Sequence, residues 1–464
     1  MANSVALPQG VLPNPVIRDP RSTGLFIFGQ LDPTLSADGV KIWLQEVTGF
    51  LRSLREPDSN DGVQFDAAVG FGPSFFQAGT TPRFGLPTTT PAGLASPPQL
   101  PASFPVAPDF VIYAMSPKEE KLVQLTQWML SCQPKPVTGL RVERGFQRAS
   151  SRENFRFLDG MRNPGIGDRA AAALVGLDQM PDEPAWVEGA AYMVYMKIRQ
   201  DLALAALLSD TGMEQAIGRR NDDGSRLDQQ PGVAAKDESD YTDPTTPGVR
   251  SHVRKVGPRG AEQGSIAIFR RGLPFMDIAP DGSAEFGLHF VSFGDFDQFD
   301  TMLNRWMLNT VFPSDDAGQD ALVAQHLIAF ELAAVFIVPP ADDRFVGAQI
   351  FDPEPKQAPG TTGRLVVRKR AVDAGGNPVR THSLRGAVFQ VLQGGNPVGE
   401  QLTTDAAGRA VSGDLSINVP YVLHEVTPLA GANPAADMPF TVGQRRQRIT
   451  VDNVFGQAPH SYGS

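Results

Sequence analysis

The first third of the chain alternates between apolar runs of strand length and apolar residues spaced as on one face of a helix. Residues 24–28 form a short apolar run, and apolar positions over 42–51 recur at intervals of three and four. The same succession returns as an apolar run at 110–114 and a helical pattern at 119–131. These periods predict an α+β domain over residues 1–150.

A second stretch repeats the alternation and predicts a second α+β domain over residues 151–350. The expected strands cover 190–198, 265–270 and 287–293, and the expected helices cover 203–208 and 296–307. The two halves therefore repeat one theme.

Three segments interrupt the pattern. Residues 79–105 are rich in proline, threonine and glycine, which predicts a surface loop without elements of its own. Residues 218–249 are polar, which predicts a solvated insertion just ahead of His252. The prolines and small residues of 351–362 predict a linker and the strongest domain boundary of the chain.

After the linker the pattern changes to short alternating strands separated by Gly, Asn, Pro and Asp turns. The expected strands lie at 365–369, 387–392, 421–425 and 449–453. They predict a small all-β domain over residues 363–456, an antiparallel immunoglobulin-like sandwich, followed by a polar tail at 457–464.

Composition limits the class of protein and its partners. The chain has 464 residues, of which 41% are hydrophobic and 20% charged, as in ordinary globular proteins. No apolar run reaches the ~18 residues of a membrane span. A net charge of −10 disfavours non-specific binding to nucleic acid, and no basic stripe interleaved with aromatic residues reverses that view.

The ends and the cysteine count bear on location. The N-terminus lacks the basic region and long apolar core of a signal peptide, so the sequence predicts a cytoplasmic protein unless another export route serves it. Cys132 is the single cysteine, which excludes an intrachain disulfide. We expect it to be a small buried hydrophobic residue.

Three short motifs carry candidate chemistry. Residues 155–164 read FRFLDGMRNP and place Asp159 between apolar residues and a glycine turn. Residues 251–254 read SHVR around His252, and an apolar strand ends at Arg270. The interval of 18 residues between them (270 − 252) fits a strand, a turn and a second strand.

In this order the motifs resemble the dye-decolorizing (DyP-type) peroxidase family, and the likeness continues in the segments 68–76 and 335–340. The resemblance implies two ferredoxin-like α+β domains of the dimeric α+β barrel type. One position departs from the family, because Arg156 stands where the family has the first glycine of its turn. If that glycine is needed for a positive φ, the loop of this chain must differ.

The resemblance also implies haem b as the cofactor and a role for each motif. His252 is expected to be the axial iron ligand, with Asp320 as the candidate carboxylate behind its second nitrogen. Asp159 is expected to act as the distal acid and base, and Arg270 to stabilise the peroxide anion. Further contacts with haem are expected from Arg271, Leu288 and Phe290.

The implied reaction reduces hydrogen peroxide and oxidises dyes, phenols or similar reductants through a ferryl intermediate. Bulky reductants do not fit a small distal pocket, so surface aromatic residues are expected to relay electrons. The candidates are Trp186, Tyr192, Tyr195 and Trp306. A homo-oligomer, and a docking partner for the C-terminal domain, are both compatible with the sequence.

Segments of the C-terminal domain resemble the collagen-adhesin B-type (Cna-B, prealbumin-like) repeat of bacterial surface proteins. These segments are 385–389, 403–408 and 421–428. In that family a lysine of the first strand and an asparagine of the last condense into an isopeptide bond, and a buried glutamate promotes the reaction. The resemblance implies these roles for Lys369, Asn453 and Glu425 respectively.

The strand period supports an interior position for the lysine. Leu365, Val367 and Lys369 share one face of a strand, so the ammonium group of Lys369 is expected to point inward. A free ammonium is costly there, and an amide link to Asn453 would remove the buried charge. The alternative is a lysine and an asparagine at a solvated strand edge.

Two other classes of function remain open from the sequence. One is a non-catalytic haem carrier or sensor with the same paired domains, which the arginine at position 156 favours. The other is an adhesive structural protein that displays the C-terminal sandwich and keeps the first domains as a scaffold.

Overall fold

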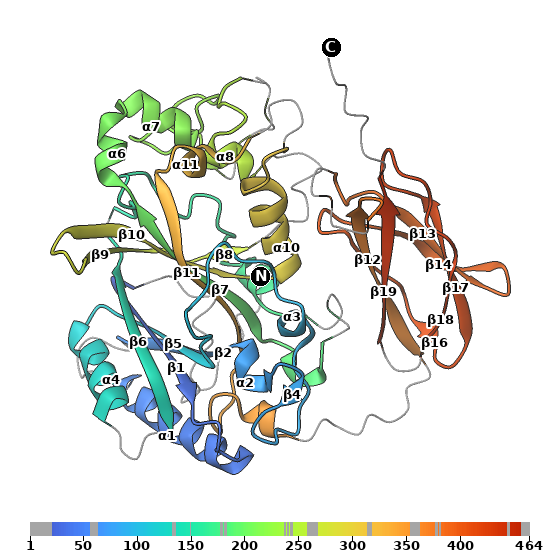
Figure 1. Ribbon diagram of the computed structural model, residues 1–464, viewed down its shortest axis with the longest axis horizontal. Coiled ribbons are helices and arrows are strands. Elements are labelled where there is room, and N and C mark those ends of the chain that lie inside the picture. The colour runs from blue at the N-terminus through green and yellow to red at the C-terminus, as the bar shows by residue number, and fades with distance from the viewer. Residues whose placement is uncertain are drawn as a thin grey trace.

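The computed structural model describes most of the chain (Figure 1). The described residues are 21–55, 64–131, 136–148, 150–176, 180, 183–235, 238, 241, 245–257, 268–312, 318–352, 362–375, 379, 382–442 and 446–455. The expectations for the N-terminal segment, for Cys132, for most of the linker and for the polar tail lie outside these residues.

Six elements of the N-terminal half form a ferredoxin-like unit. They are β1 (Thr23–Leu31), α1 (Ala37–Arg55), β2 (Asp66–Phe71), β5 (Phe110–Ser116), α4 (Glu119–Ser131) and β6 (Val137–Phe146). The strands are antiparallel in the order β6-β1-β5-β2. Helices α1 and α4 cover one face of them (Figure 1), and α1 does so with the apolar stripe of Trp43, Val47 and Leu51. The strands and helices expected here are confirmed.

The second half repeats this arrangement. Its elements are β7 (Ala191–Gln200), α6 (Leu202–Leu207), α7 (Asp210–Ile217), α8 (His252–Lys255), β8 (Phe269–Arg270), β9 (Leu273–Ile278), β10 (Ala284–Phe293), α10 (Phe296–Asp300), η4 (Thr301–Met307), α11 (Ala321–Ala324) and β11 (Ile328–Val338). The strand order is β11-β7-β10-β8, with β9 also paired to β10. The helix expected over 296–307 begins as α10 and continues in the wider π-helical turns of η4.

The two halves join edge to edge through β2 and β11 in one nine-stranded sheet. Among the described residues these strands pair at a single position, Ile337 with Phe71. The two strands approach closely there, since a Cβ on Gly70 would lie 3.0 Å from the Cβ of Phe336. Each face of the sheet buries its own hydrophobic cluster, and both clusters contain residues of both halves. Side-chain packing therefore holds the halves together more than the strand ladder does.

Short elements complete these domains. They are α2 (Pro73–Phe76), β3 (Gln77–Ala78), β4 (Thr81–Pro82), α3 (Ala92–Ala95), α5 (Arg169–Ala173), η2 (Ala185–Val187) and η5 (Ala348–Phe351). Three of them lie in or next to the segment 79–105, so its prediction as a plain surface loop was wrong. Leu94 and Phe84 are buried and anchor this segment to the core. In the described part of the chain, no helix is both long and apolar enough to cross a lipid bilayer.

Two further expectations for the second half need correction. The interval from His252 to Arg270, expected to hold a strand, a turn and a second strand, begins instead with the one-turn helix α8, with Ser251 at its N-cap position. The segment 218–249 is not simply solvated, since Arg219 and Arg226 are buried in its described part. Arg226 is bound by Asp228 and lies over the ring of Tyr241, so polar residues here pair with one another inside the fold.

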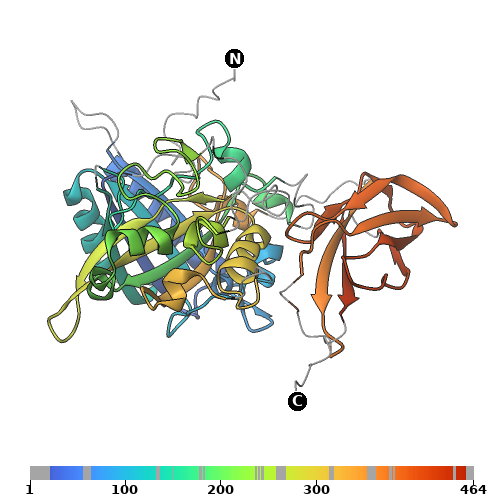
Figure 2. The same cartoon turned by 90° about the horizontal axis from the view of Figure 1, so that it is seen from above.

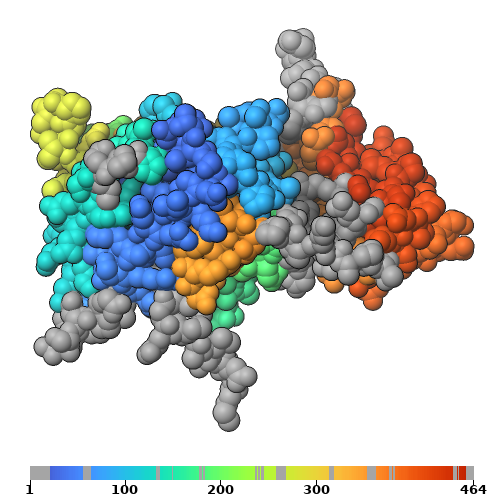
Figure 3. Space-filling model, turned by 90° about the horizontal axis from the view of Figure 1, so that it is seen from below, coloured from blue at the N-terminus to red at the C-terminus, as the bar shows by residue number. Residues whose placement is uncertain are grey.

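In the residues that the structure describes, the regular elements of the C-terminal domain are all strands. They are β12 (Thr362–Val372), β13 (Val388–Gln393), β14 (Asn396–Thr403), β15 (Arg409–Val411), β16 (Leu415–Ser416), β17 (Pro420–Thr427), β18 (Met438–Thr441) and β19 (Arg446–Val454). One sheet has the order β14-β13-β17-β18, and β12 carries β15, β16 and β19 in the other. The expected fully antiparallel pattern was wrong, because the first and last strands, β12 and β19, pair in parallel. Figures 2 and 3 show this sandwich as a lobe beside the rest of the molecule.

One buried histidine lies between the two halves of the sheet. His289 of β10 is fully buried, and its Nε2 lies 3.0 Å from the carbonyl oxygen of Arg144. A carbonyl oxygen only accepts, so Nε2 carries the hydrogen and Nδ1 accepts from the Tyr195 hydroxyl, 3.0 Å away. Burial lowers the pKa of His289 to about 4.

This pKa predicts a pH-dependent loss of stability. Above the ordinary pKa of 6.5 the ring is neutral in both folded and unfolded chains, and as the pH falls toward about 4 only the unfolded chain takes up the proton. We expect His289→Gln, measured by urea unfolding of the full chain, to lose about 2 to 3 kcal/mol less than the parent between pH 7 and pH 4.5. Equal losses in the two proteins would contradict a neutral buried histidine.

Candidate functional site

One cavity in the second half gathers the three residues singled out in the sequence. It is bounded by Asp159 from the loop before α5, by His252 at the start of α8, and by Arg270 at the end of β8. The rest of the wall is mainly apolar and includes Met196, Ile198, Leu288, Phe290, Met302, Leu303 and Met307. Leu288 and Phe290, expected to contact the cofactor, are therefore in this wall.

A buried carboxylate orients His252. The Nδ1 atom of His252 lies 2.8 Å from Oδ2 of Asp320, which is fully buried. The other carboxylate oxygen accepts from the backbone N–H of Leu322 at 2.9 Å and caps α11. The carboxylate requires a hydrogen on Nδ1, so Nε2 keeps its lone pair. Among the described residues we find no hydrogen bond to this Nε2, which belongs to a side chain in the cavity wall.

Glu153 fixes the loop that presents Asp159, and sequence reasoning missed it. Its carboxylate accepts the backbone N–H groups of Phe155 at 2.8 Å and Phe157 at 3.0 Å, and also binds the side chain of Gln200. Burial raises the pKa of Glu153 to about 7, although these donors oppose the rise. A glutamate two residues before an aromatic turn carries no distinctive sequence signal, because its role depends on a loop that folds back.

Arg156 has the backbone conformation that its place in the motif requires. Its φ is +73°, in the left-handed region that favours glycine. The expectation that the loop must differ was wrong, since the loop keeps the positive φ with an arginine in place of glycine. The Arg156 side chain extends to the surface and pairs with Asp210 at 3.0 Å, where both groups are exposed. The strain is therefore stored in the backbone and not offset by a buried contact.

Arg270 is a partly buried cation whose guanidinium has no side-chain partner among the described residues. Its backbone is held on both sides by Asn163, which accepts from the Arg270 N–H at 3.0 Å and donates to its carbonyl at 2.8 Å. Within the described residues the guanidinium makes no hydrogen bond, and its Nε is buried. Burial lowers the pKa of Arg270, while the nearby charge of Asp159 opposes this shift. The group is thus placed to receive an anion.

A glycine keeps the aspartate close to the strand end. A Cβ at Gly272 would lie 2.7 Å from Oδ2 of Asp159 and 3.2 Å from a methyl group of Leu288. A side chain at position 272 would displace Asp159 or make the cavity narrower.

The structure does not bring Arg271 into this cavity. Arg271 is buried on the other face of the strand, with its guanidinium 5.5 Å from the ring centre of Tyr113. It lines a separate hollow that it shares with Asp159 and Arg270. Arg219, which the sequence did not single out, does line the cavity, and its buried Nη2 has no partner among the described residues.

The four aromatic residues named as electron relays are not at the surface. Trp186, Tyr192, Tyr195 and Trp306 are between 0% and 8% exposed. Tyr192 donates a hydrogen bond to Glu183 at 2.6 Å, and its ring packs against Phe296 in a tilted arrangement with ring centres 4.5 Å apart. The expectation that these four residues form a surface relay was wrong, because their side chains pack inside the fold.

The C-terminal domain brings Lys369, Glu425 and Asn453 together in its core. The three are between 0% and 4% exposed. Lys369 Nζ lies 2.5 Å from one oxygen of Glu425, and Asn453 Nδ2 donates to the other at 2.8 Å. The backbone N–H of Leu429 donates to the amide oxygen of Asn453 at 2.9 Å. The alternative of a solvated strand edge does not describe these positions.

Comparisons with known proteins find relatives of the two α+β halves. Residues 150–343 match the profile of a family described as "Dyp-type peroxidase, C-terminal". A deferrochelatase from Escherichia coli is 29% identical over 142 residues, which are 30% of this chain and 33% of that protein. The chain thus matches about a third of the length of this curated relative.

Solved structures of similar fold cover both halves. Ferric DtpA from Streptomyces lividans has a TM-score of 0.60 at 22% identity and covers 73% of this chain and 94% of its own. A DyP-type peroxidase from Cellulomonas bogoriensis has a TM-score of 0.59 at 22% identity, covering 75% and 98%. A variant of DypB from Rhodococcus jostii in complex with heme has a TM-score of 0.54 at 21% identity, covering 71% and 97%.

At these identities the structures establish the fold, a ferredoxin-like α+β pair as in DyP-type peroxidases. The family match places residues 150–343 beside the C-terminal part of Dyp-type peroxidases. The family match ends at residue 343, before the C-terminal strands, so it does not bear on the sandwich.

The strained arginine gives a direct prediction for stability. Arg156→Gly removes the left-handed strain and loses only an exposed ion pair. We expect the variant to be more stable to urea by about 1 kcal/mol, since strain of this kind costs roughly 1 to 2 kcal/mol and glycine's chain entropy returns part of it. Arg152→Gly, at a neighbouring position outside the positive-φ set, is the matched control and should be destabilising. A loss of stability in Arg156→Gly would contradict the strain.

Proposed function

We propose that this protein is a haem peroxidase that reduces hydrogen peroxide and oxidises dyes, phenols or similar small reductants. The observation that carries the proposal is the joint presence of His252, Asp159 and Arg270 in one apolar cavity. The match to the DyP-type family and the haem-bound relative support it.

The cavity residues fit a haem group. His252 would hold the haem iron, because its Nδ1 is engaged by Asp320 and its Nε2 lone pair is left for a metal. The apolar wall, including Leu288 and Phe290, suits the porphyrin plane. Arg219 is better placed than Arg271 to bind a haem carboxylate, since it lines the cavity with a buried unpaired nitrogen. When bound, the iron supplies the redox chemistry that protein side chains lack.

Asp159 and Arg270 would act on the peroxide. Asp159 would accept the proton of one peroxide oxygen and donate it to the other, which would leave as water, while bound haem would supply two electrons and accept the remaining oxygen. Arg270 stabilises the hydroperoxide anion by charge, with no hydrogen bond to break first, because its guanidinium has no partner among the described residues. Glu153 and Gly272 position Asp159 for this transfer.

A visible absorption spectrum of the haem-reconstituted full chain tests the proposal. We expect a Soret band in the parent and a loss of tight haem binding in His252→Ala, with a shift of the band after one equivalent of hydrogen peroxide in the parent. Asp159→Asn and Arg270→Leu should keep the haem but react with peroxide on the order of 10² to 10³ times more slowly.

His424→Ala is the matched control, because His424 is an exposed histidine of the C-terminal domain. It should behave as the parent does. Haem bound without any response to peroxide would point to a carrier or sensor. An absence of haem that depends on His252 would remove both haem functions and favour the adhesive scaffold.

We further propose that the C-terminal domain is an immunoglobulin-like Cna-B module with a Lys369–Asn453 isopeptide bond. Burial lowers the pKa of Lys369, which favours the neutral amine needed for attack. Its Nζ would attack Cγ of Asn453, the new C–N bond forming as the bond to Nδ2 breaks. Glu425 lies between the two groups and would carry a proton from Nζ to the departing nitrogen, which leaves as ammonia. The N–H of Leu429 would stabilise the oxygen of the intermediate.

Intact mass spectrometry of the full chain tests the crosslink. We expect the parent to be lighter than its sequence mass by one ammonia, and Glu425→Gln and Lys369→Arg to have their full sequence masses. The link would close a loop of 84 residues (453 − 369), so its loss should destabilise the domain by about 4 kcal/mol on a loop-entropy basis. A parent with the full sequence mass would contradict the bond.

A further inference from the structure

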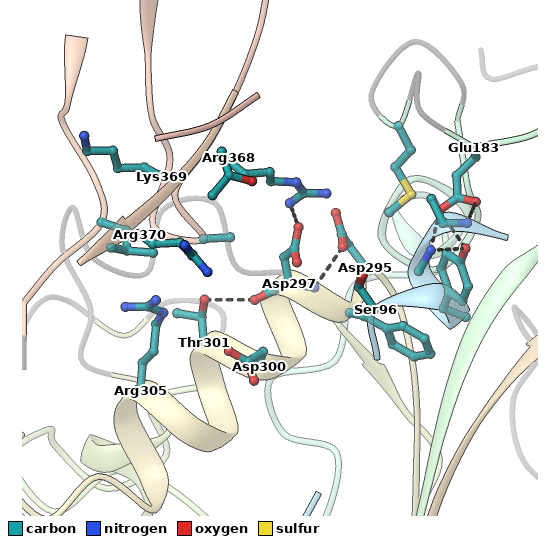
Figure 4. Close-up of a pocket in the computed structure, with 18 residues that line it drawn as sticks. Ser96, Glu183, Asp295, Asp297, Asp300, Thr301, Arg305, Arg368, Lys369 and Arg370 are labelled. Atoms are coloured by element: carbon teal, nitrogen blue, oxygen red, sulfur yellow. Dashed lines mark hydrogen bonds and ion pairs between the residues drawn. The ribbon is translucent and has the colours of Figure 1, made fainter. Parts of the chain in front are cut away.

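The sandwich and the second half meet at a pair of arginines opposite a pair of aspartates. Arg368 of β12 pairs with Asp297, and Arg409 of β15 lies 3.1 Å from Asp295. Asp295 and Asp297 stand at the start of α10, on the side of the body that faces the sandwich (Figures 1 and 2). Figure 4 shows the Arg368 side chain reaching from its strand toward the Asp297 carboxylate, with Asp295 beside it. We call these four residues the interdomain clamp.

The arginine pair is unfavourable without its partners. Arg368 and Arg409 are directly opposite each other on neighbouring antiparallel strands, so their like charges repel. The side chains of Arg409 and Asp295 are 10% and 15% exposed, so water screens them little. Two carboxylates on the facing helix turn this repulsion into attraction. The sandwich therefore presents a surface that suits one partner chemistry, a closely spaced pair of carboxylates.

The helix that carries these aspartates continues to the candidate haem cavity. α10 passes directly into η4, whose Met302, Leu303 and Met307 lie in the cavity wall. The carbonyl oxygen of Met307 accepts the backbone N–H of Asp320 at 3.0 Å. Asp320 in turn holds Nδ1 of His252 at 2.8 Å. A continuous set of contacts thus joins the clamp to the histidine.

We propose that the C-terminal sandwich docks on α10 through the interdomain clamp and thereby braces the histidine side of the haem cavity. Docking is a property of the chain itself and does not require haem. The coupling to haem rests on the proposed function. The sandwich then serves as an internal support of the catalytic domain rather than a tether alone.

The clamp offers a clean set of variants in the full chain. Arg368→Ala with Arg409→Ala removes both cations, whereas Asp295 is left unchanged because it also caps α10 by accepting the Asp297 N–H at 2.9 Å. Arg364→Ala is the matched control. Arg364 lies on the same strand as Arg368, but it pairs with Asp414 of the same domain. A variant that combines Arg368→Asp with Asp297→Arg exchanges the two charges of one ion pair. It should dock as the parent does.

Docking is measured first on haem-free protein, by small-angle scattering and by amide hydrogen exchange. We expect the double alanine variant to have a larger radius of gyration and exchange in residues 296–307 on the order of tenfold faster. The Arg364→Ala protein and the reversed pair should match the parent. Unchanged scattering and exchange in the double variant would overturn the docking, and so would a reversed pair that remains undocked while its sandwich is folded.

The coupling is measured next by haem titration of the same proteins. We expect the double alanine variant to bind haem about fivefold more weakly than the parent, a size usual for coupled sites. A double variant that is undocked but keeps the parent's haem affinity would refute the proposed bracing of the haem cavity. The proposal that the sandwich docks through the clamp would still stand. A parent that binds no haem would instead refute the proposed function, and the scattering result would still decide the docking.

Discussion

The candidate site depends on one hydrogen bond, between Nδ1 of His252 and the carboxylate of Asp320. A carboxylate with no exposure to water is costly unless its oxygens are bound, and here one oxygen caps α11 while the other holds the histidine. The same bond fixes which ring nitrogen carries the hydrogen. The apolar side chains, Asp159 and Arg270 form the other parts of the cavity wall.

Much of the fold could be predicted from the sequence, because the strands and helices of both halves have clear hydrophobic periods. The strands expected at 110–114 and 287–293 lie inside β5 and β10. The predictions failed where tertiary contacts determine whether a segment is buried. The segment 218–249 looks solvated by composition, yet Arg226 is buried against Asp228 and Tyr241. A polar segment that satisfies its own charges cannot be told from a solvated one by composition.

Only the site residues that lie in recognisable sequence motifs could be predicted. Asp159, His252 and Arg270 lie in one cavity, and Asp320 lies behind the histidine as expected. Arg271 comes directly after the last residue of β8 and lies against Tyr113 instead of in the cavity, a placement that its motif does not express. Glu153 and Arg219 were missed because they come from a loop and an insertion that only the folded chain brings to the cavity.

The seam between β2 and β11 has a consequence for how the site can vary. With one ladder pairing at the seam, the angle between the halves is set by side chains such as Phe336, packed against Gly70. A change of volume at that contact would tilt the second half as a body, and the cavity would move with it, because all of its lining residues belong to that half. Substitutions at the seam can therefore change the angle between the halves while the cavity wall keeps its internal geometry.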